Sequence, residues 1–167
     1  KAETQKFQRN NFGGLPENAK ATIYISCVDN VQTRFDIAEM LKAMSKRRAS
    51  RDEPKYWLDF GNSQQTGQVI LSTIGEIKQP NSEKYETVAS LPMVTDEFGE
   101  LLKQSEQTDN TPSCSLAEAL EKQDLYINAT LAQMGCSLLW SMFRYGLTEN
   151  RGFFLNLKNF HSQPIKL

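Results

Sequence analysis

The chain has 167 residues, of which 39% are hydrophobic and 23% charged, values typical of one soluble globular domain with a substantial core. Its 19 basic and 20 acidic residues give a net charge of −1, so overall charge favours neither a nucleic-acid nor a membrane partner. No apolar run is long enough to span a membrane as a helix. The three cysteines form no C-x-x-C pair, which argues against a disulfide scaffold or a structural zinc and predicts a reducing, cytoplasmic location.

The first half of the chain alternates apolar runs with one amphipathic segment. Its predicted elements, in chain order, are a polar lead-in over 1–20, a buried strand over 21–28, a helix capped near its start by Thr33 or Asp36, and strands over 56–60 and 68–74. The strand, helix and strand over 21–60 make a βαβ unit. Because a helical crossover joins parallel strands, the predicted fold class is α/β with a mainly parallel, Rossmann-like sheet.

The second half is dominated by one long helical pattern. A strongly hydrophilic stretch over 103–113 is predicted to be a mobile crossover segment. A helix is predicted over 115–145, with a break near 121–124 because an unbroken helix of that length would be unusually long. Its apolar face repeats every three or four residues at Ile127, Leu131, Met134, Leu138 and Met142. A last strand follows over 152–157, and a short tail carries the single histidine, His161.

Several cysteines and large aromatic residues are predicted to be core residues. They lie inside apolar patterns, where such side chains pack more often than they bind ligands. They are Cys27, Cys136, Trp57, Trp140, Phe153 and Phe154.

Polar residues gather where the first predicted strand ends. Asp29 and Asn30 follow the strand directly, and Arg34 lies one helical turn later. In open α/β sheets ligands bind beyond the carboxyl ends of the strands, so Asp29 is a candidate to hold Mg²⁺ on a nucleotide phosphate. The alternative is structural: Asp29 or Asn30 caps the helix and Arg34 pairs with a neighbouring acid. Asp59 has a similar ambiguity at the end of the second strand.

Cys114 is the candidate nucleophile. Pro112 precedes it, and Ser115 with Glu118 forms the S-x-x-E pattern of a helix start. Free backbone N–H groups and the positive end of the helix dipole favour a thiolate at such a position. The alternative is that Cys114 is a small buried apolar residue.

Three segments taken together resemble a known family. They are ISCVDNVQTRFDIAEML, WLDFGNSQQTGQVIL and TPSCSLAEAL, in that order. They look like the later half of the ThiF/MoeB/HesA family, relatives of the ubiquitin-activating enzymes, with its D-N-x-x-x-R motif and its P-x-C-[TS] segment. The stretch PSCSLAEALEKQDLYIN and the ending RGFFLNL look most like the ThiF-type proteins of PRTRC systems on bacterial mobile elements. The resemblance covers about residues 21–167.

The resemblance implies ATP-dependent adenylation of the C-terminal carboxylate of a ubiquitin-like or sulfur-carrier protein. Asp29 would match the acid that engages Mg²⁺·ATP, and Asn30 and Arg34 would complete its motif. Cys114 would match the cysteine that takes the carrier as a thioester. ATP and Mg²⁺ are the implied cofactors, and a homodimer is the implied assembly, with no zinc, nucleic acid or membrane expected.

The chain also departs from the family pattern. The glycine-rich nucleotide loop and the acid that binds the ribose, which lie upstream of the D-N motif in the family, have no counterpart in this sequence. The chain is therefore expected to be the C-terminal part of an adenylation domain, incomplete at its N-terminal side and inactive alone. The alternatives are a non-catalytic module that binds a ubiquitin-like protein or a sister subunit, and a Rossmann-type enzyme with another cofactor.

Overall fold

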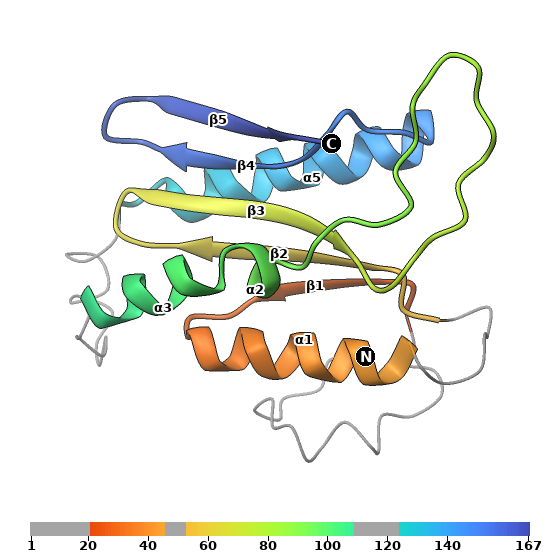
Figure 1. The fold of residues 1–167 in the computed structure, drawn as a ribbon. Coiled ribbons are helices and arrows are strands. Elements are labelled where there is room, and N and C mark those ends of the chain that lie inside the picture. Colours follow the sequence, from red (N-terminus) through yellow and green to blue (C-terminus); the bar gives the residue numbers. More distant parts are fainter. Residues whose placement is uncertain (1–20, 46–52, 109–123) are drawn as a thin grey trace.

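The computed structural model describes residues 21–45, 53–108 and 124–167 of the chain. Within these ranges five strands form one open sheet in the order β1-β2-β3-β4-β5. Helices lie on both faces of the sheet, α1, α2 and α3 on one and α5 on the other (Figure 1). The protein is therefore α/β, with the sheet as the middle of three layers.

The predicted βαβ unit is present. Strand β1 (Ile23–Cys27) and strand β2 (Tyr56–Asn62) pair in parallel, and helix α1 (Val31–Ser45) lies between them in the chain. The apolar residues of α1 recur at helical spacing, which buries Ile37 and Leu41 against the sheet. The strand–helix–strand order and the helical spacing of apolar residues in α1 thus account for the first half of the fold.

The rest of the described sheet is antiparallel. Strand β3 (Thr66–Thr73) pairs with β2 and with β4 (Asn150–Asn156), and β4 pairs with β5 (His161–Lys166). A mixed sheet therefore replaces the predicted mainly parallel one, since only β1 and β2 are parallel here. For two of the three antiparallel pairs the reason is the length of the connection: a parallel crossover needs a dozen or more residues, and the connections after β2 and β4 are far shorter.

Two apolar clusters fill the layers. One lies under α1, α2 (Val94–Glu97) and α3 (Gly99–Thr108), with Trp57 and Ile70 at its centre. The other lies between the sheet and α5 (Ile127–Tyr145), and Leu58 and Val69 belong to it. All four of these sheet residues are completely buried, each contributing roughly 1.5–3 kcal/mol of transfer free energy.

Helix α5 confirms the predicted apolar face, but two other residues of this helix that were predicted to be buried are exposed. The predicted apolar stripe at Ile127, Leu131, Met134, Leu138 and Met142 packs against the sheet. Cys136 and Trp140, predicted as core, are exposed instead, and 63% of Trp140 is accessible. Each lies two residues, about 200° around the helix, from members of the stripe and so points away from the sheet.

Four further predictions from the second half of the chain have different outcomes. The predicted C-terminal tail is strand β5, which begins at His161. Residues 103–108 of the predicted mobile crossover belong to α3, and 109–113 lie outside the described residues. Helix α5 begins at Ile127, after the predicted break, while 115–123 lie outside the described ranges. Phe153 is buried as predicted, but Phe154 is 37% exposed because the two point to opposite faces of β4.

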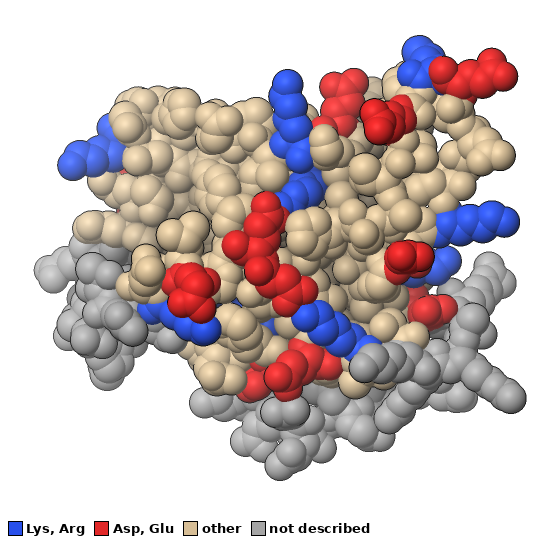
Figure 2. All heavy atoms as spheres, in the orientation of Figure 1, with Lys and Arg blue, Asp and Glu red and all other residues tan. Residues whose placement is uncertain are grey.

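Charged side chains of both signs are mixed on the face that carries α1, α2 and α3. Figure 2 shows acidic and basic groups beside one another on this face. Three of the ion pairs made by the described residues of these helices are Lys42 with Asp96, both half-exposed, Arg151 with Glu97, where Arg151 is buried, and Lys103 with Glu100 within α3. The second pair ties α2 to β4, and Arg151 also lies 5.9 Å from the centre of the Phe98 ring.

Candidate functional site

The predicted nucleotide-site residues surround one loop, which joins the carboxyl end of β1 to α1. Asp29 is exposed in this loop, and its carboxylate has no hydrogen-bond or ion-pair partner among the described residues. Asn30 is also exposed, but its Oδ1 accepts a hydrogen bond of 2.7 Å from the Thr33 backbone N–H. Asn30 therefore caps α1, which confirms the structural alternative for this residue; the other predicted caps, Thr33 and Asp36, do not cap the helix.

Arg34 projects from the first turns of α1 into the interior, where only 5% of it is exposed. Its Nε donates to Asp59 Oδ2 at 3.1 Å. Its Nη2 donates to the Val28 carbonyl at 2.6 Å and to the Phe60 carbonyl at 3.1 Å. The guanidinium thus joins the carboxyl ends of the two parallel strands and uses these donors within the protein.

Asp59 is completely buried and links Arg34 to the core. Its Oδ1 accepts a hydrogen bond of 2.6 Å from the Ser26 hydroxyl, and the Trp57 indole N–H donates to the same Ser26 oxygen at 2.8 Å. We call Trp57, Ser26, Asp59 and Arg34 the β1–β2 polar network. Both carboxylate oxygens of Asp59 accept a donor, an arrangement that suits the ionised form.

Burial opposes that ionised form. Removal from water raises the pKa of Asp59 above its ordinary value, while the Arg34 charge and the hydrogen bonds from Ser26 and Arg34 act in the opposite direction. The network therefore holds a charge that is costly to bury, and it depends on every one of its donors.

From the sequence, Asp59 was an acid at a strand end that could be a ligand or the start of a turn. Ser26 was not predicted to have a role. Two polar residues inside apolar, β-branched strands were the available signal, since a buried polar group needs a partner. The missing information was the register: Ser26 lies directly beside Asp59 in the parallel pair of β1 and β2.

Cys27 lies two residues before Asp29 on β1 and is exposed, whereas it was predicted to be buried in the strand. Desolvation and the nearby Asp59 charge raise the pKa of its thiol, although Arg34 opposes the rise. A raised pKa leaves less thiolate at neutral pH, so Cys27 is poorly suited to act as a nucleophile. Cys114, the predicted nucleophile, lies outside the described residues.

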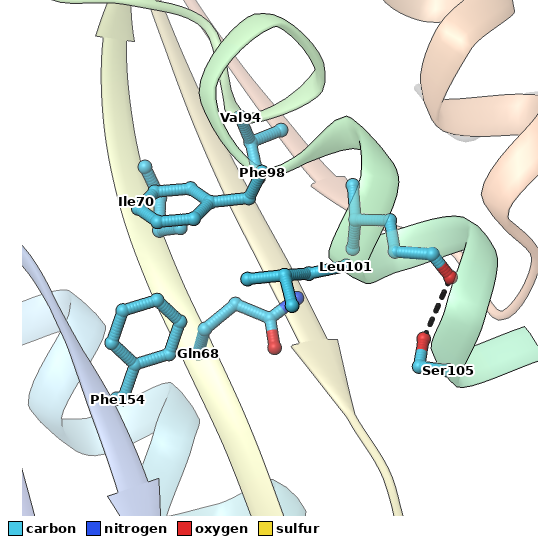
Figure 3. A pocket seen from close by; sticks show the side chains of 8 residues that line it. Gln68, Ile70, Val94, Phe98, Leu101, Ser105 and Phe154 are labelled. Atoms are coloured by element: carbon cyan, nitrogen blue, oxygen red, sulfur yellow. Dashed lines mark hydrogen bonds between the residues drawn. The ribbon is translucent and has the colours of Figure 1, made fainter.

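An apolar pocket of about 170 Å³ lies between α3 and the sheet (Figure 3). The rings of Phe98 and Phe154 meet edge to face in it, with 5.3 Å between their centres. Gln68 lies at its edge. A Cβ atom added to Gly61 would fall 2.2 Å from Gln68 Nε2 and 2.8 Å from Arg34 Nη2, so both side chains pass over that glycine.

Leu101 contributes to the rim of the pocket, where 61% of it is exposed. Leu102 beside it is buried, and its backbone carbonyl accepts a hydrogen bond of 2.7 Å from the Ser105 hydroxyl. The pocket is small for a drug-sized ligand, and its lining is mainly apolar.

The described residues offer neither a metal-binding cluster nor a membrane-spanning helix. In the part of the chain that the structure describes, no three His, Cys, Asp or Glu side chains lie together in a way that could hold a metal ion. None of the described helices is long and apolar enough to cross a membrane.

Comparison with known proteins leaves the family open. No protein-family model matches the chain, and no curated protein sequence matches it. The class that the structure defines is an α/β protein with an open mixed sheet and a polar network where its parallel strands end.

Proposed function

We propose that the chain belongs to an ATP-dependent adenylating enzyme of the ThiF/MoeB/HesA type, with a Rossmann-like nucleotide site. Its substrate is the C-terminal carboxylate of a ubiquitin-like or sulfur-carrier protein. One observation supports this most: Asp29 presents a free, exposed carboxylate at the carboxyl end of β1, in the loop where ligands bind in such sheets. Arg34 of the same motif anchors that loop through Val28.

The proposed chemistry has two steps. First, a carboxylate oxygen of the carrier attacks the α-phosphorus of ATP, the bond to the β-phosphate breaks, and pyrophosphate leaves with an acyl-adenylate formed. Second, the Cys114 thiolate attacks the acyl carbon, a thioester forms, and AMP leaves. A carboxylate is a poor electrophile until AMP is its leaving group, so adenylation has to come first.

Asp29 fits the role of a magnesium ligand. Mg²⁺ is held in nucleotide sites by one or two carboxylates together with phosphate oxygens and waters, and it neutralises phosphate charge when bound. Asp29 supplies one such carboxylate, with no partner among the described residues that would compete for it. Asn30 and Arg34 support the loop through hydrogen bonds within the protein.

Asp29→Ala should abolish ATP–pyrophosphate exchange by the complete protein with its carrier. Loss of a ligand at the charged phosphates removes electrostatic stabilisation worth roughly 10²–10³ in rate. Because Asp29 is exposed and its carboxylate has no partner in the described ranges, the variant should keep its thermal stability. Asp36→Ala on α1 is the control, and exchange at the wild-type rate in Asp29→Ala would refute this role.

Cys114→Ser should change the covalent adduct formed with ATP and carrier. The wild-type adduct is expected to be cleaved by a thiol reductant such as dithiothreitol, whose thiol takes the acyl group of a thioester and releases the Cys114 thiol. The serine variant should give a reductant-resistant ester or no adduct, because an alcohol is the weaker nucleophile at neutral pH. Cys136→Ser is the matched control, since Cys136 is an exposed cysteine on α5. A reducible adduct of unchanged yield in Cys114→Ser would place the reaction elsewhere.

A second candidate is an interaction module that binds without activating. The observation that favours it is the outer surface of α5, which leaves large apolar side chains in water. Trp140 and Phe143, three residues apart on one helix face, are 63% and 68% exposed. Such a surface is typical of a contact between protein chains, and a second copy of this chain is the partner we propose for it.

Trp140→Lys with Phe143→Lys should weaken self-association at least 10-fold in sedimentation equilibrium. Buried aromatic residues dominate contact energies, and a lysine there would have to lose its hydration. Leu101→Lys is the control, because Leu101 is equally exposed but lies on α3 across the sheet. A double variant that associates like the wild type, or a wild type that stays monomeric, would exclude α5 as the contact.

A further inference from the structure

We infer that Asp59 is a positioning residue for the proposed adenylation, acting through Arg34 on the loop that carries Asp29. The inference rests on the proposed function, and it gives a role to a residue that the family motif does not include. Asp59 itself is completely buried and does not reach a ligand at the loop, so its effect has to pass through Arg34.

The Asp29 backbone is held on both sides. On the N-terminal side, the Val28 carbonyl accepts a hydrogen bond of 2.6 Å from Arg34 Nη2. On the C-terminal side, Asn30 is fixed by its capping bond of 2.7 Å to the Thr33 N–H. Between these two anchors the Asp29 carboxylate remains exposed. This arrangement fixes a backbone position while leaving its side chain available for a ligand.

The anchor at Val28 depends on Asp59. A guanidinium that is 5% exposed requires a counter-charge, and Asp59 Oδ2 provides it at 3.1 Å from Arg34 Nε. The Nε contact also sets the plane of the guanidinium, and with it the direction of the Nη2 donor. Without Asp59, Arg34 has no described acid to hold it beneath the loop.

Asp59 is in turn held by the core. The Ser26 hydroxyl donates to its other oxygen at 2.6 Å, and Ser26 receives the indole N–H of Trp57, which is completely buried. A continuous path of hydrogen bonds therefore runs from the centre of one apolar cluster to the loop. Gly61 completes the fit, because a side chain there would collide with Arg34 Nη2.

The test compares Asp59→Asn with wild type in the complete protein. The KM for Mg²⁺·ATP in pyrophosphate exchange should rise roughly 10- to 100-fold, the usual effect of losing a residue that orients a metal ligand. The KM for the carrier should stay within about twofold, since the network lies at the nucleotide end of the proposed site. Amide hydrogen exchange over residues 28–31 should become faster, and this readout does not require activity.

Two variants separate positioning from folding. Glu97→Gln breaks the other ion pair with a buried arginine, that of Arg151, and should leave both KM values and exchange over 28–31 unchanged. Arg34→Lys keeps a positive charge beside Asp59, but one ammonium cannot reproduce the forked contacts to the acid and the two carbonyls. It should therefore give the same KM change and the same faster exchange as Asp59→Asn, and it replaces that variant if Asp59→Asn does not fold.

The outcomes distinguish this inference from the proposed function. If the wild type shows no carrier-dependent ATP–pyrophosphate exchange, the proposed function fails, whatever Asp59 does. If Asp29→Ala is inactive but both network variants keep the wild-type KM for Mg²⁺·ATP, the positioning role is overturned. Unchanged amide exchange over 28–31 in both variants would also overturn it, because Arg34 would then not be holding the loop.

Discussion

Asp59→Asn is expected to lower the free energy of unfolding by about 3–5 kcal/mol, the usual cost of breaking a buried ion pair on one side only. The substitution leaves the Arg34 charge buried without its acid and removes an acceptor for the Ser26 hydroxyl. Asp96→Asn provides the comparison, because Asp96 pairs with Lys42 at the surface and should cost at most about 1 kcal/mol. Urea denaturation of the chain measures both variants, and equal losses would contradict the importance given to the network.

The pH dependence of that difference tests the cause. Burial raises the pKa of Asp59 above its ordinary value of 3.8. At pH values between 3.8 and this raised pKa, Asp59 binds a proton in the folded state but not in the unfolded chain. Stability from this group therefore decreases as pH rises across that window. The advantage of the wild type over Asp59→Asn should grow as pH is lowered toward 3.8. An advantage that shrinks instead would show that Arg34 outweighs burial and lowers the pKa.

The β1–β2 polar network shows what a sequence pattern can and cannot reveal. The apolar runs at 21–28 and 56–60 and the helical spacing between them predicted β1, α1 and β2, because these elements are defined by local periodicity. The pairing of Ser26 with Asp59 depends on how two strands 33 residues apart align. No local pattern contains that alignment.

The sequence contains a local signal for the antiparallel pairing of β2 and β3, namely the short connection between them. Only residues 63–65 separate β2 from β3, and the stretch between the predicted strands is rich in turn residues, as in a hairpin. The prediction instead extended the parallel βαβ pattern along the whole sheet. Strand β5 was harder to find because it is mostly exposed and carries Pro164, both typical of an edge strand.

For two of the candidate site residues the structure follows the structural alternative of the sequence analysis, because Asn30 caps α1 and Arg34 pairs with an acid. Asp29, Asn30 and Arg34 lie around one loop, as their spacing predicted. Their different roles follow from their hydrogen bonds: Asp29 has no side-chain partner among the described residues, Asn30 caps a helix, and Arg34 is paired inside. Three neighbouring polar residues therefore have three different roles, as a possible ligand, a helix cap and an anchor, because the backbone directs each side chain to a different environment.

Gly152→Ala is expected to destabilise the chain by about 3 kcal/mol, at the upper end of the cost of overpacking. A Cβ atom at Gly152 would lie 2.1 Å from the Val69 carbonyl oxygen and 3.0 Å from Ile70 Cα. These are backbone atoms of β3, so no side-chain rotation can relieve the contact. Strands β3 and β4 would have to separate, and the register of β4 with β5 is already irregular at this glycine.

Gly99→Ala is the matched control for that substitution. Its added Cβ would meet the Phe35 ring at 3.2 Å, and this ring can shift by a few tenths of an ångström. A change within about 1 kcal/mol is expected, because loss of chain entropy in the unfolded state offsets part of the contact cost. Equal effects in the two variants would contradict the close approach of β4 to β3. A larger loss of folding free energy in Gly152→Ala would show that the close spacing of β3 and β4 sets the geometry of this half of the sheet. The apolar pattern at 152–157 does not reveal that spacing.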